Sequence, residues 1–495
     1  LQQSTGFGKI SGFSPSHTLK PSHLSLKFAL TLHLAMARAG RHALPDEKTR
    51  VEAAWNFYRG MGSPRFICAP MVGQSELPFR LMLRQAGCDL CYTPMLHAEE
   101  FAGSSEEEMA RQGFATSTED RPLVVQFCAK TPEDFLQAAL QVQDRCDAVD
   151  LNLGCPQSKA MKGGWGGALM DEEHWHLVYA IVRHAASSPE LRVPVTCKIR
   201  IFADDRKTIR FAKMLEEAGC SFLTVHGRQR DRALHHAPAR WEAIRMVREA
   251  LKIPVASNGG VSSYESALRC LKETGCVAVM VATALLQNPE LFLPLKEEEA
   301  AEDDATETTC TSGSSKPLLS QGVRHCLLYL QMCEHEPPWS LRWARDHLRA
   351  LLAGASSLEL LALLDAVPMA HALPQDLSAF AEERRIYWKE ICQDFRDVIK
   401  NISIHEGLCS PESTHFADLY WGTGSATRVL EHLSGSKGYS LVVEGASRAQ
   451  QALLRGAPVS KRFAERQKQK ALAIKSCLLS TSKVSERLRN KTETT

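Results

Sequence analysis

The sequence predicts an α/β fold in two parts, a closed barrel of eight strand–helix units followed by a smaller all-helical domain. Two patterns indicate this. Short apolar runs alternate with amphipathic stretches from Arg65 to Leu291, and apolar residues recur at helical spacing from Leu318 to about Lys400. The chain has 495 residues, which is more than one compact domain usually holds, so two domains with tails are expected.

The expected strands are short and rich in Val, Ile, Phe and Leu, as strands buried on both faces are. The eight are Phe66–Ala69, Leu90–Thr93, Leu123–Phe127, Ala148–Asn152, Val195–Ile199, Phe222–Val225, Val255–Ser257 and Ala278–Val281. Several of the helical stretches between them stop at a glycine, as at Gly87, Gly219 and Gly275. Eight such units in about 230 residues match a TIM (β/α)8 barrel, and a doubly wound open sheet is the alternative.

The first 50 residues are expected to lie outside the fold. No Asp or Glu occurs before Asp46, and Ser, His and Lys are frequent. The chain begins with Leu1 and its first methionine is Met36. This part is therefore either disordered or non-native sequence before a start at Met36, or a targeting segment for an organelle. The first interpretation is preferred.

The other boundaries follow from composition. An acidic, Ser-rich stretch that is too polar to bury divides the chain into a barrel domain, 64–296, a linker, 297–317, and a helical domain, 318–400. Residues 401–495 lack a core pattern and end in a basic segment, so we expect a poorly defined basic tail.

Composition excludes several classes of protein. The 16 cysteines follow no framework spacing, which indicates reduced thiols in an intracellular, cytoplasmic or nuclear, protein. No apolar run approaches the length of a membrane span. The net charge of +2 indicates no partner by itself, so a nucleic-acid surface would need local clusters of basic residues.

Polar and reactive groups stand where the expected strands end, which is where ligands bind in a TIM barrel. They come from at least five strands, too many for chance placement. In chain order they are Ala69-Pro70-Met71, Gln126, Asn152, Cys155, Lys198, Arg200, His226, Arg228 and Asn258-Gly259-Gly260.

The residue types at these strand ends indicate a flavin site. Lys198, Arg200 and His226 supply positive charge and donors that would stabilise a reduced flavin, which is negative near N1 and O2. Gln126 both donates and accepts hydrogen bonds, as the flavin pyrimidine edge requires. Cys155, on a Gly-rich loop, is the best placed cysteine to serve as a nucleophile or a proton donor.

The glycines of Asn258-Gly259-Gly260 would let the backbone approach a phosphate, which TIM barrels commonly hold after the seventh and eighth strands.

Each of these groups has a simpler interpretation when taken alone. A Lys or Arg at a strand end often only pairs with a carboxylate, and Cys155 alone would more often be a small buried apolar residue. Cys88 and Cys91 resemble half a zinc site, but no second pair follows at finger spacing, so we interpret them as structural. Trp339 and Trp343 are expected to pack a helix rather than stack on bases.

An ordered series of motifs resembles the tRNA-dihydrouridine synthase family. The series is Cys68-Ala-Pro-Met71, Gln126, Asp150-Leu-Asn-Leu-Gly-Cys-Pro156, Cys197-Lys-Ile-Arg200, Thr224-Val-His-Gly-Arg228 and Ser257-Asn-Gly-Gly260. Stretches such as Tyr92-Thr-Pro-Met-Leu-His97 most resemble the eukaryotic subgroup named for positions 16 and 17. The resemblance is strong over roughly residues 64–292 and weak to about residue 400.

The resemblance implies an FMN-binding barrel with a helical tRNA-binding domain, and NADPH as the reductant of FMN. Cys155 would be the general acid that protonates C5 of a uracil after hydride delivery to C6. Asn152, Arg200 and Arg228 would face the substrate. The flavin contacts would be Ala69, Pro70, Met71, Gln126, Lys198, His226, Asn258, Gly259, Gly260, Ala282 and Thr283.

The tRNA would bind through backbone contacts and shape, with the target base extruded. The candidate phosphate contacts are Lys159, Lys162, Arg228, Arg230, Arg232, Arg342, Arg345 and Arg349. Neither a membrane nor a metal partner is expected, and the chain is expected to be a monomer.

Three positions depart from the family pattern. Ala282-Thr283 stand where many members carry Gly-Arg, Gly73 stands where eukaryotic members often have an acidic residue, and the bulky Trp165 interrupts a loop of small residues. Two alternatives therefore stay open, a small-molecule flavin reductase of the dihydroorotate dehydrogenase kind and a catalytically silent tRNA-binding protein.

Overall fold

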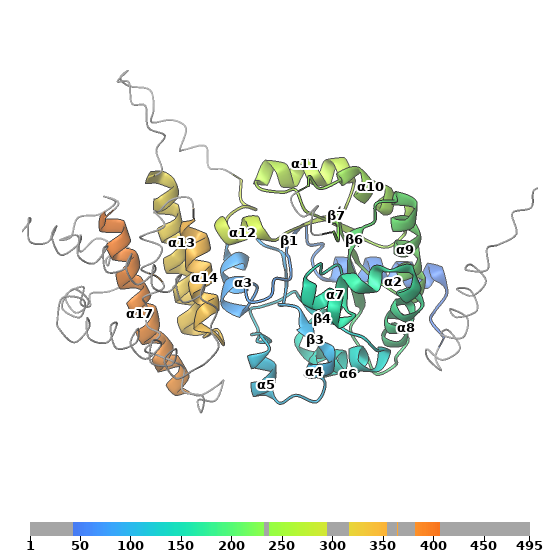
Figure 1. Ribbon diagram of the computed structural model, residues 1–495, viewed down its shortest axis with the longest axis horizontal. Helices are drawn as coiled ribbons and strands as arrows, with labels where there is room; N and C mark the ends of the chain where they lie inside the picture. Colours follow the sequence, from blue (N-terminus) through green and yellow to red (C-terminus); the bar gives the residue numbers. More distant parts are fainter. Residues whose placement is uncertain (1–42, 232–236, 295–315, 354–363, 365–381, 406–495) are drawn as a thin grey trace, which may run out of the picture.

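The computed structural model describes residues 43–231, 237–294, 316–353, 364 and 382–405. Helices surround a strand barrel, and three further helices, α13, α14 and α17, stand beside it (Figure 1). Among the helices of these residues, none is both long enough and apolar enough to cross a bilayer.

The barrel is closed and all its strands run parallel. Its eight strands are β1 (Phe66–Cys68), β2 (Leu90–Tyr92), β4 (Leu123–Cys128), β5 (Ala148–Leu153), β6 (Val195–Ile201), β7 (Leu223–Gln229), β8 (Val255–Asn258) and β9 (Ala278–Val281). Strand β2 pairs with both β1 and β4, which closes the sheet on itself. The predicted TIM barrel is thus confirmed, and the alternative of a doubly wound open sheet is excluded. The short β3 (Leu96–His97) extends the second unit alongside the end of β4.

Helices follow the strands in the expected alternation. They are α3 (Leu77–Gln85), α4 (Ala98–Phe101), α5 (Glu106–Arg111), α6 (Pro132–Val142), α7 (Ser158–Gly163), α8 (Trp175–Ala186), α9 (Asp205–Ala218), α10 (Trp241–Ala250), α11 (Tyr264–Thr274) and α12 (Thr283–Gln287), with 3-10 turns η1 (Gln143–Arg145), η2 (Gly166–Met170) and η3 (Glu172–His174). Gly219 and Gly275 end α9 and α11 in left-handed conformation, with φ of 108° and 66°. Glycine adopts this conformation without the steric cost that a Cβ would add, so the predicted helix stops are confirmed.

A helix that the sequence did not indicate closes the far end of the barrel. Helix α2 (Glu47–Gly60) is capped by Asp46, so the folded part begins inside the range predicted as an extension, 1–50. The Tyr58 ring stacks on Phe222 at 6.0 Å, and its hydroxyl donates to the Val277 carbonyl at 3.2 Å. Phe222 and Val277 each stand directly before a barrel strand, β7 and β9 respectively. Helix α2 therefore covers the end of the barrel opposite to the ends where ligands are expected.

The helical domain consists of α13 (Lys316–His335), α14 (Leu341–Leu352) and α17 (Glu382–His405). The predicted boundary at residue 400 falls inside α17, where Ile402 is still buried. Within the region where the sequence predicts helices, residues 358–367 lie outside the described residues except for Leu364, as do most of the linker and the tail. One apolar core joins this domain to the barrel, since Phe79 of α3 and Trp388 of α17 belong to the same cluster.

A buried polar contact fixes the helical domain to the barrel. The Glu76 carboxylate, just before α3, accepts hydrogen bonds from the Tyr329 hydroxyl at 2.7 Å and from His347 Nε2 at 2.9 Å. Burial alone would raise the pKa of Glu76, but these two partners outweigh it and the pKa lies below its usual value. The His347 ring also stacks on Phe79 at 4.3 Å. This satisfied buried carboxylate thus adds a specific polar contact to the apolar core that joins the two domains.

We expect Glu76→Ala to destabilise the protein by about 3 kcal/mol, because Tyr329 and His347 would lose their buried acceptor. The measurement is urea unfolding followed by circular dichroism. Glu107→Ala is the matched control, since Glu107 pairs with Arg111 in an exposed i,i+4 bridge and should change the midpoint far less. Equal shifts for the two variants would contradict this role of Glu76.

Candidate active site

Strand register brings the predicted polar residues together at the carboxyl ends of β5 to β8. Asn152 is the register partner of Lys198, and His226 is the partner of both Arg200 and Asn258. Parallel neighbours end at the same edge of the sheet, so these side chains lie at one mouth of the barrel.

A chain of hydrogen bonds runs through the barrel interior below this mouth. The Asp150 carboxylate accepts from the Thr196 hydroxyl at 2.6 Å and from Gln126 Nε2 at 2.9 Å. Gln126 Oε1 in turn accepts from Asn152 Nδ2 at 2.8 Å. Asp150 and Gln126 are both fully buried, and burial raises the pKa of Asp150 to about 6 despite these donors and nearby Lys198.

This chain ends on the backbone of Cys155. Asn152 Oδ1 accepts from the N–H groups of Gly154 and Cys155, each at 3.0 Å. The two backbone N–H groups need an acceptor, which must be the Asn152 amide oxygen. Gln126 Oε1 needs a donor, which must be the Asn152 amide nitrogen, so the Asn152 amide has one orientation. The asparagine side chain thereby sets the turn that carries the thiol.

The glycine turn η2 lies against the Cys155 loop. Gly167 donates its N–H to the Cys155 carbonyl at 3.0 Å and accepts from Arg230 at 2.7 Å. A Cβ at Gly167 would lie 2.6 Å from the Cys155 carbonyl oxygen, and one at Gly166 would lie 3.0 Å from Cys155 Cβ. Only glycine fits such an approach, so the small residues of this loop follow from its contact with the cysteine.

Three cationic side chains, Lys198, Arg200 and Arg228, lie around the mouth, and their mutual repulsion lowers pKa values there. Burial lowers the pKa of Lys198 to about 8 and that of Arg200 to about 10, with Arg200 and Arg228 respectively adding to the effect. Burial, followed by the charges of Lys198, Arg200 and Arg228, puts the pKa of His226 well below its usual value. His226 is therefore neutral at pH 7, while the site as a whole attracts an anion.

The expected phosphate region is built from backbone with no room for side chains. Gly259 and Gly260 have φ of 96° and 79°, and a Cβ on Gly259 would lie 3.0 Å from His226 Nε2. Asn258 Nδ2 donates to the Met280 carbonyl at 2.8 Å, which ties β8 to β9. A phosphate-bearing, anionic cofactor fits this combination of a glycine cradle and unbalanced positive charge.

The remaining predicted cofactor residues flank this cradle. Ala69 donates its N–H to the Val281 carbonyl at 2.9 Å at the end of β1, and Pro70 follows it. The Met71 N–H is bound by Ser75 Oγ at 3.0 Å, and Ala282 and Thr283 begin α12 directly after β9.

The predicted RNA contacts differ in their surroundings. Lys159 and Lys162 are exposed on α7, and Arg342 lies 3.6 Å from Asp346 on the surface of α14. Arg230 is engaged by Asp171 and the Gly167 carbonyl, which makes it a brace of the η2 turn. Arg345 and Arg349 lie on α14 and Arg228 at the end of β7, whereas Arg232 lies outside the described residues.

The sequence interpretation assigned no role to Asp150 or Thr196, where the buried hydrogen-bond chain begins. A signal was present, because an Asp inside the apolar run Ala148–Leu153 is rarely buried unless it is paired. The partner, however, comes from another strand 46 positions away and could not be named from spacing.

Comparison with known proteins identifies the family. A family model described as dihydrouridine synthase (Dus) matches residues 67–357. The chain belongs to the dihydrouridine synthase family. The resemblance expected from the motifs is thereby confirmed.

Three relatives are named tRNA-dihydrouridine(16/17) synthase, the rat one with the suffix "like". The rat (Rattus norvegicus) protein is 48% identical over 235 residues, which is 47% of this chain and 53% of the relative. The Schizosaccharomyces pombe protein is 45% identical over 244 residues, 48% of this chain and 60% of the relative. The Saccharomyces cerevisiae protein is 47% identical over 236 residues, 47% of this chain and 55% of the relative. The matched part thus spans 53 to 60% of the length of these three relatives.

Two departures from the family pattern have a steric basis. Gly73 has a φ of 70°, and a Cβ there would lie 2.9 Å from Nε1 of Trp343 in α14. Trp343 also approaches Gly113, so it packs between barrel loops. Trp165 is buried, and its ring meets the His97 ring edge-on at 4.7 Å. The bulky residue of the loop therefore points into a small apolar cluster beside Cys155.

We expect Cys155 to be the first described cysteine to react with iodoacetamide, because the other twelve in the described residues are buried. Burial raises the pKa of Cys155 above its usual value, so its alkylation should be slow at pH 7 and increase at higher pH than for a free cysteine. Mass spectrometry of the Cys155 peptide across pH measures this. A midpoint below that of free cysteine would contradict the protonated thiol.

Proposed function

We propose that this protein is an FMN-dependent tRNA-dihydrouridine synthase that reduces the C5–C6 bond of D-loop uridines with NADPH as reductant. The observation that carries the proposal is the thiol of Cys155, held by Asn152 at the rim of a cationic barrel mouth. The names of the relatives, which specify tRNA dihydrouridine and NAD(P), support the substrate and the reductant.

FMN fits the residues of the mouth. Its phosphate would lie against Asn258, Gly259 and Gly260, with Ala282 and Thr283 completing the cradle. Its ring would lie over the barrel between Met71, Gln126, Lys198 and His226, where Lys198 offsets negative charge and neutral His226 contributes a ring nitrogen. When bound, the flavin supplies the hydride that adds to C6 of the uracil.

Cys155 would donate the proton that C5 requires once C6 has received a hydride. A general acid must be protonated at the working pH, and the raised pKa of Cys155 keeps it a thiol at neutral pH. Asn152 positions the Cys155 backbone through its own hydrogen bond, and its second amide hydrogen remains for a uracil carbonyl. Arg200 and Arg228 would face the substrate from the next two strands.

The uridine must leave the tRNA stack to reach Cys155, since a paired or stacked base cannot enter a barrel mouth. The helical domain offers a second contact surface, because α14 carries Arg342, Arg345 and Arg349 and is fixed to the barrel through Glu76. Basic side chains on a rigid support would bind the tRNA backbone largely without regard to sequence.

The experiment incubates the purified protein with NADPH and tRNA transcribed in vitro, which lacks dihydrouridine. A gain of two daltons in D-loop fragments after nuclease digestion is the expected result. Cys155→Ala should keep its flavin and tRNA binding but lose about 100-fold or more in turnover. Cys276→Ala, at a buried cysteine away from the mouth, is the matched control. A yellow protein that oxidises NADPH without changing tRNA would contradict the proposal.

Lys198 gives the proposed reaction an upper pH limit. The pKa of Lys198 is about 8, so its positive charge is present below that pH and is lost as the pH rises through it. We expect turnover to fall above about pH 8 for this reason, and Lys198→Arg, which stays charged, to move the fall upward. The measurement is the pH profile of tRNA reduction in both proteins, and identical profiles would count against this role of Lys198.

A further inference from the structure

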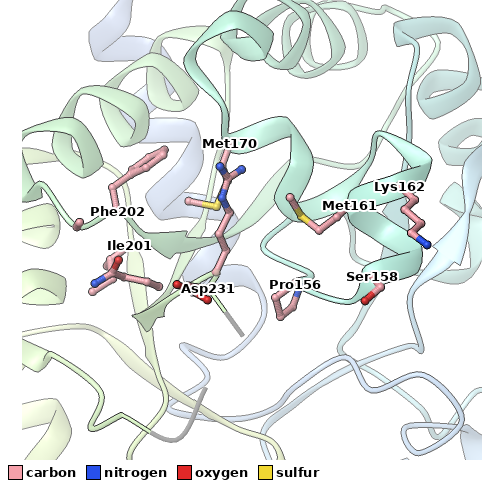
Figure 2. Close-up of a pocket in the computed structure, with 11 residues that line it drawn as sticks. Pro156, Ser158, Met161, Lys162, Met170, Ile201, Phe202 and Asp231 are labelled. Carbon is pink, nitrogen blue, oxygen red and sulfur yellow. The ribbon is translucent and has the colours of Figure 1, made fainter. Parts of the chain in front are cut away.

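A cleft of about 630 Å³ opens beside the barrel mouth. It lies between helix α7 and the ends of β6 and β7, and Figure 2 shows Met161 and Pro156 on one side of it and Ile201 and Phe202 on the other. Cys155, Lys198 and His226 do not line it, so it is separate from the site described above. Its volume is that of a small-molecule site, and the proposed reaction leaves it unused.

One wall of the cleft is a braced aromatic ring. Phe202 is partly buried, its ring packs against Trp175 at 6.0 Å and Phe211 at 5.7 Å, and Lys207 Nζ lies over the ring at 5.0 Å from its centroid. Across the cleft, Met161 exposes 39% of its surface, which is unusual for a large apolar side chain. A packed ring on one side of the cleft and a flexible thioether on the other suit a flat, apolar ligand such as a nucleobase.

Three charged side chains line the rim of the cleft, the cations Lys162 and Arg230 and the anion Asp231. Lys162 lines it from α7, and among the residues that the structure describes none forms an ion pair with Lys162. Arg230 also lines it, but its guanidinium is already bound to Asp171 and to the Gly167 carbonyl. Lys162 is therefore the cation available to a phosphate at this rim.

The cleft begins next to the thiol. Pro156, which follows Cys155, forms part of its lining. Arg200 connects the two regions, because it donates to the Gly154 carbonyl at 2.9 Å and to the carbonyl of Gln229, a lining residue, at 3.1 Å. An RNA strand that presents a base to Cys155 continues on both sides of that base. On the side of the cleft, its next nucleotide would meet the Phe202 ring and the Lys162 ammonium group.

We propose that the cleft binds the nucleotide next to the target uridine, with its base against Phe202 and its phosphate near Lys162. This inference rests on the proposed function and adds a second base site to it. The adenine nucleotide of NADPH also combines a base with phosphate. It is not covalently joined to the target uridine, however, so nothing would hold it beside Cys155, whereas the neighbouring nucleotide of the tRNA is so joined. The cleft would thus recognise the sequence or flexibility of the RNA beside the reduced base.

The test uses tRNA that carries the fluorescent base 2-aminopurine on either side of the target uridine. Binding to the wild-type protein should quench the fluorescence at one of these two positions by stacking. Phe202→Leu, which keeps apolar packing on Trp175 but removes the ring, should abolish the quench and raise the KM for tRNA about tenfold. Lys162→Gln should reduce the dependence of tRNA affinity on salt by about one phosphate contact.

Leu268→Ala is the matched control, because Leu268 is an exposed apolar residue on α11, away from the cleft. An unchanged quench in Phe202→Leu would overturn the inference. So would a raised KM for NADPH with an unchanged KM for tRNA, which would assign the cleft to the cofactor. Failure of the proposed function appears separately, as wild-type protein that binds the labelled tRNA without a two-dalton gain.

Discussion

The carboxyl end of the barrel depends on one buried carboxylate. Asp150 stands inside β5 with no exposed surface, where an unpartnered charge would cost several kcal/mol. Thr196 and Gln126 satisfy it, and in doing so they fix the amide of Gln126 and then that of Asn152. The turn that holds Cys155 is therefore oriented from the barrel interior. A buried polar network of this kind is destabilising unless every member has its hydrogen-bond partners. The network therefore holds one arrangement, and the Cys155 thiol has a defined position before any ligand binds.

The two ends of the barrel are stabilised in different ways. At the amino end, Tyr58 of α2 packs its ring on Phe222 and fills the interior with apolar contacts. At the carboxyl end, backbone hydrogen bonds and close-packed glycines hold η2 against the Cys155 loop. The apolar end contributes stability, and the polar end holds half-buried charges such as Lys198 where a ligand would bind. Repulsion among the cations at the mouth destabilises the fold, and apolar packing at the amino end offsets it.

Much of this arrangement could be predicted from the sequence. Strands buried on both faces are continuous apolar runs, so all eight were found, and the positions of Lys198 and His226 followed from where the runs end. Helix α2 was missed because its sequence is polar and only weakly amphipathic, and its few buried residues, such as Tyr58, contact distant strands. The Asp150 network and the Gly73–Trp343 contact join residues far apart in the chain, which no local pattern can indicate.

The position of α2 determines how this protein can be shortened. A fragment cut at the first barrel strand, Phe66, would seem complete by strand count. It would nevertheless uncover the Phe222 ring and leave the backbone carbonyls of Lys252 and Val277 without the donors that Trp55 and Tyr58 supply. Truncated forms for crystallisation or for fusion to other domains should therefore retain the chain from about residue 43 and place any junction before Asp46, since α2 is part of the barrel domain.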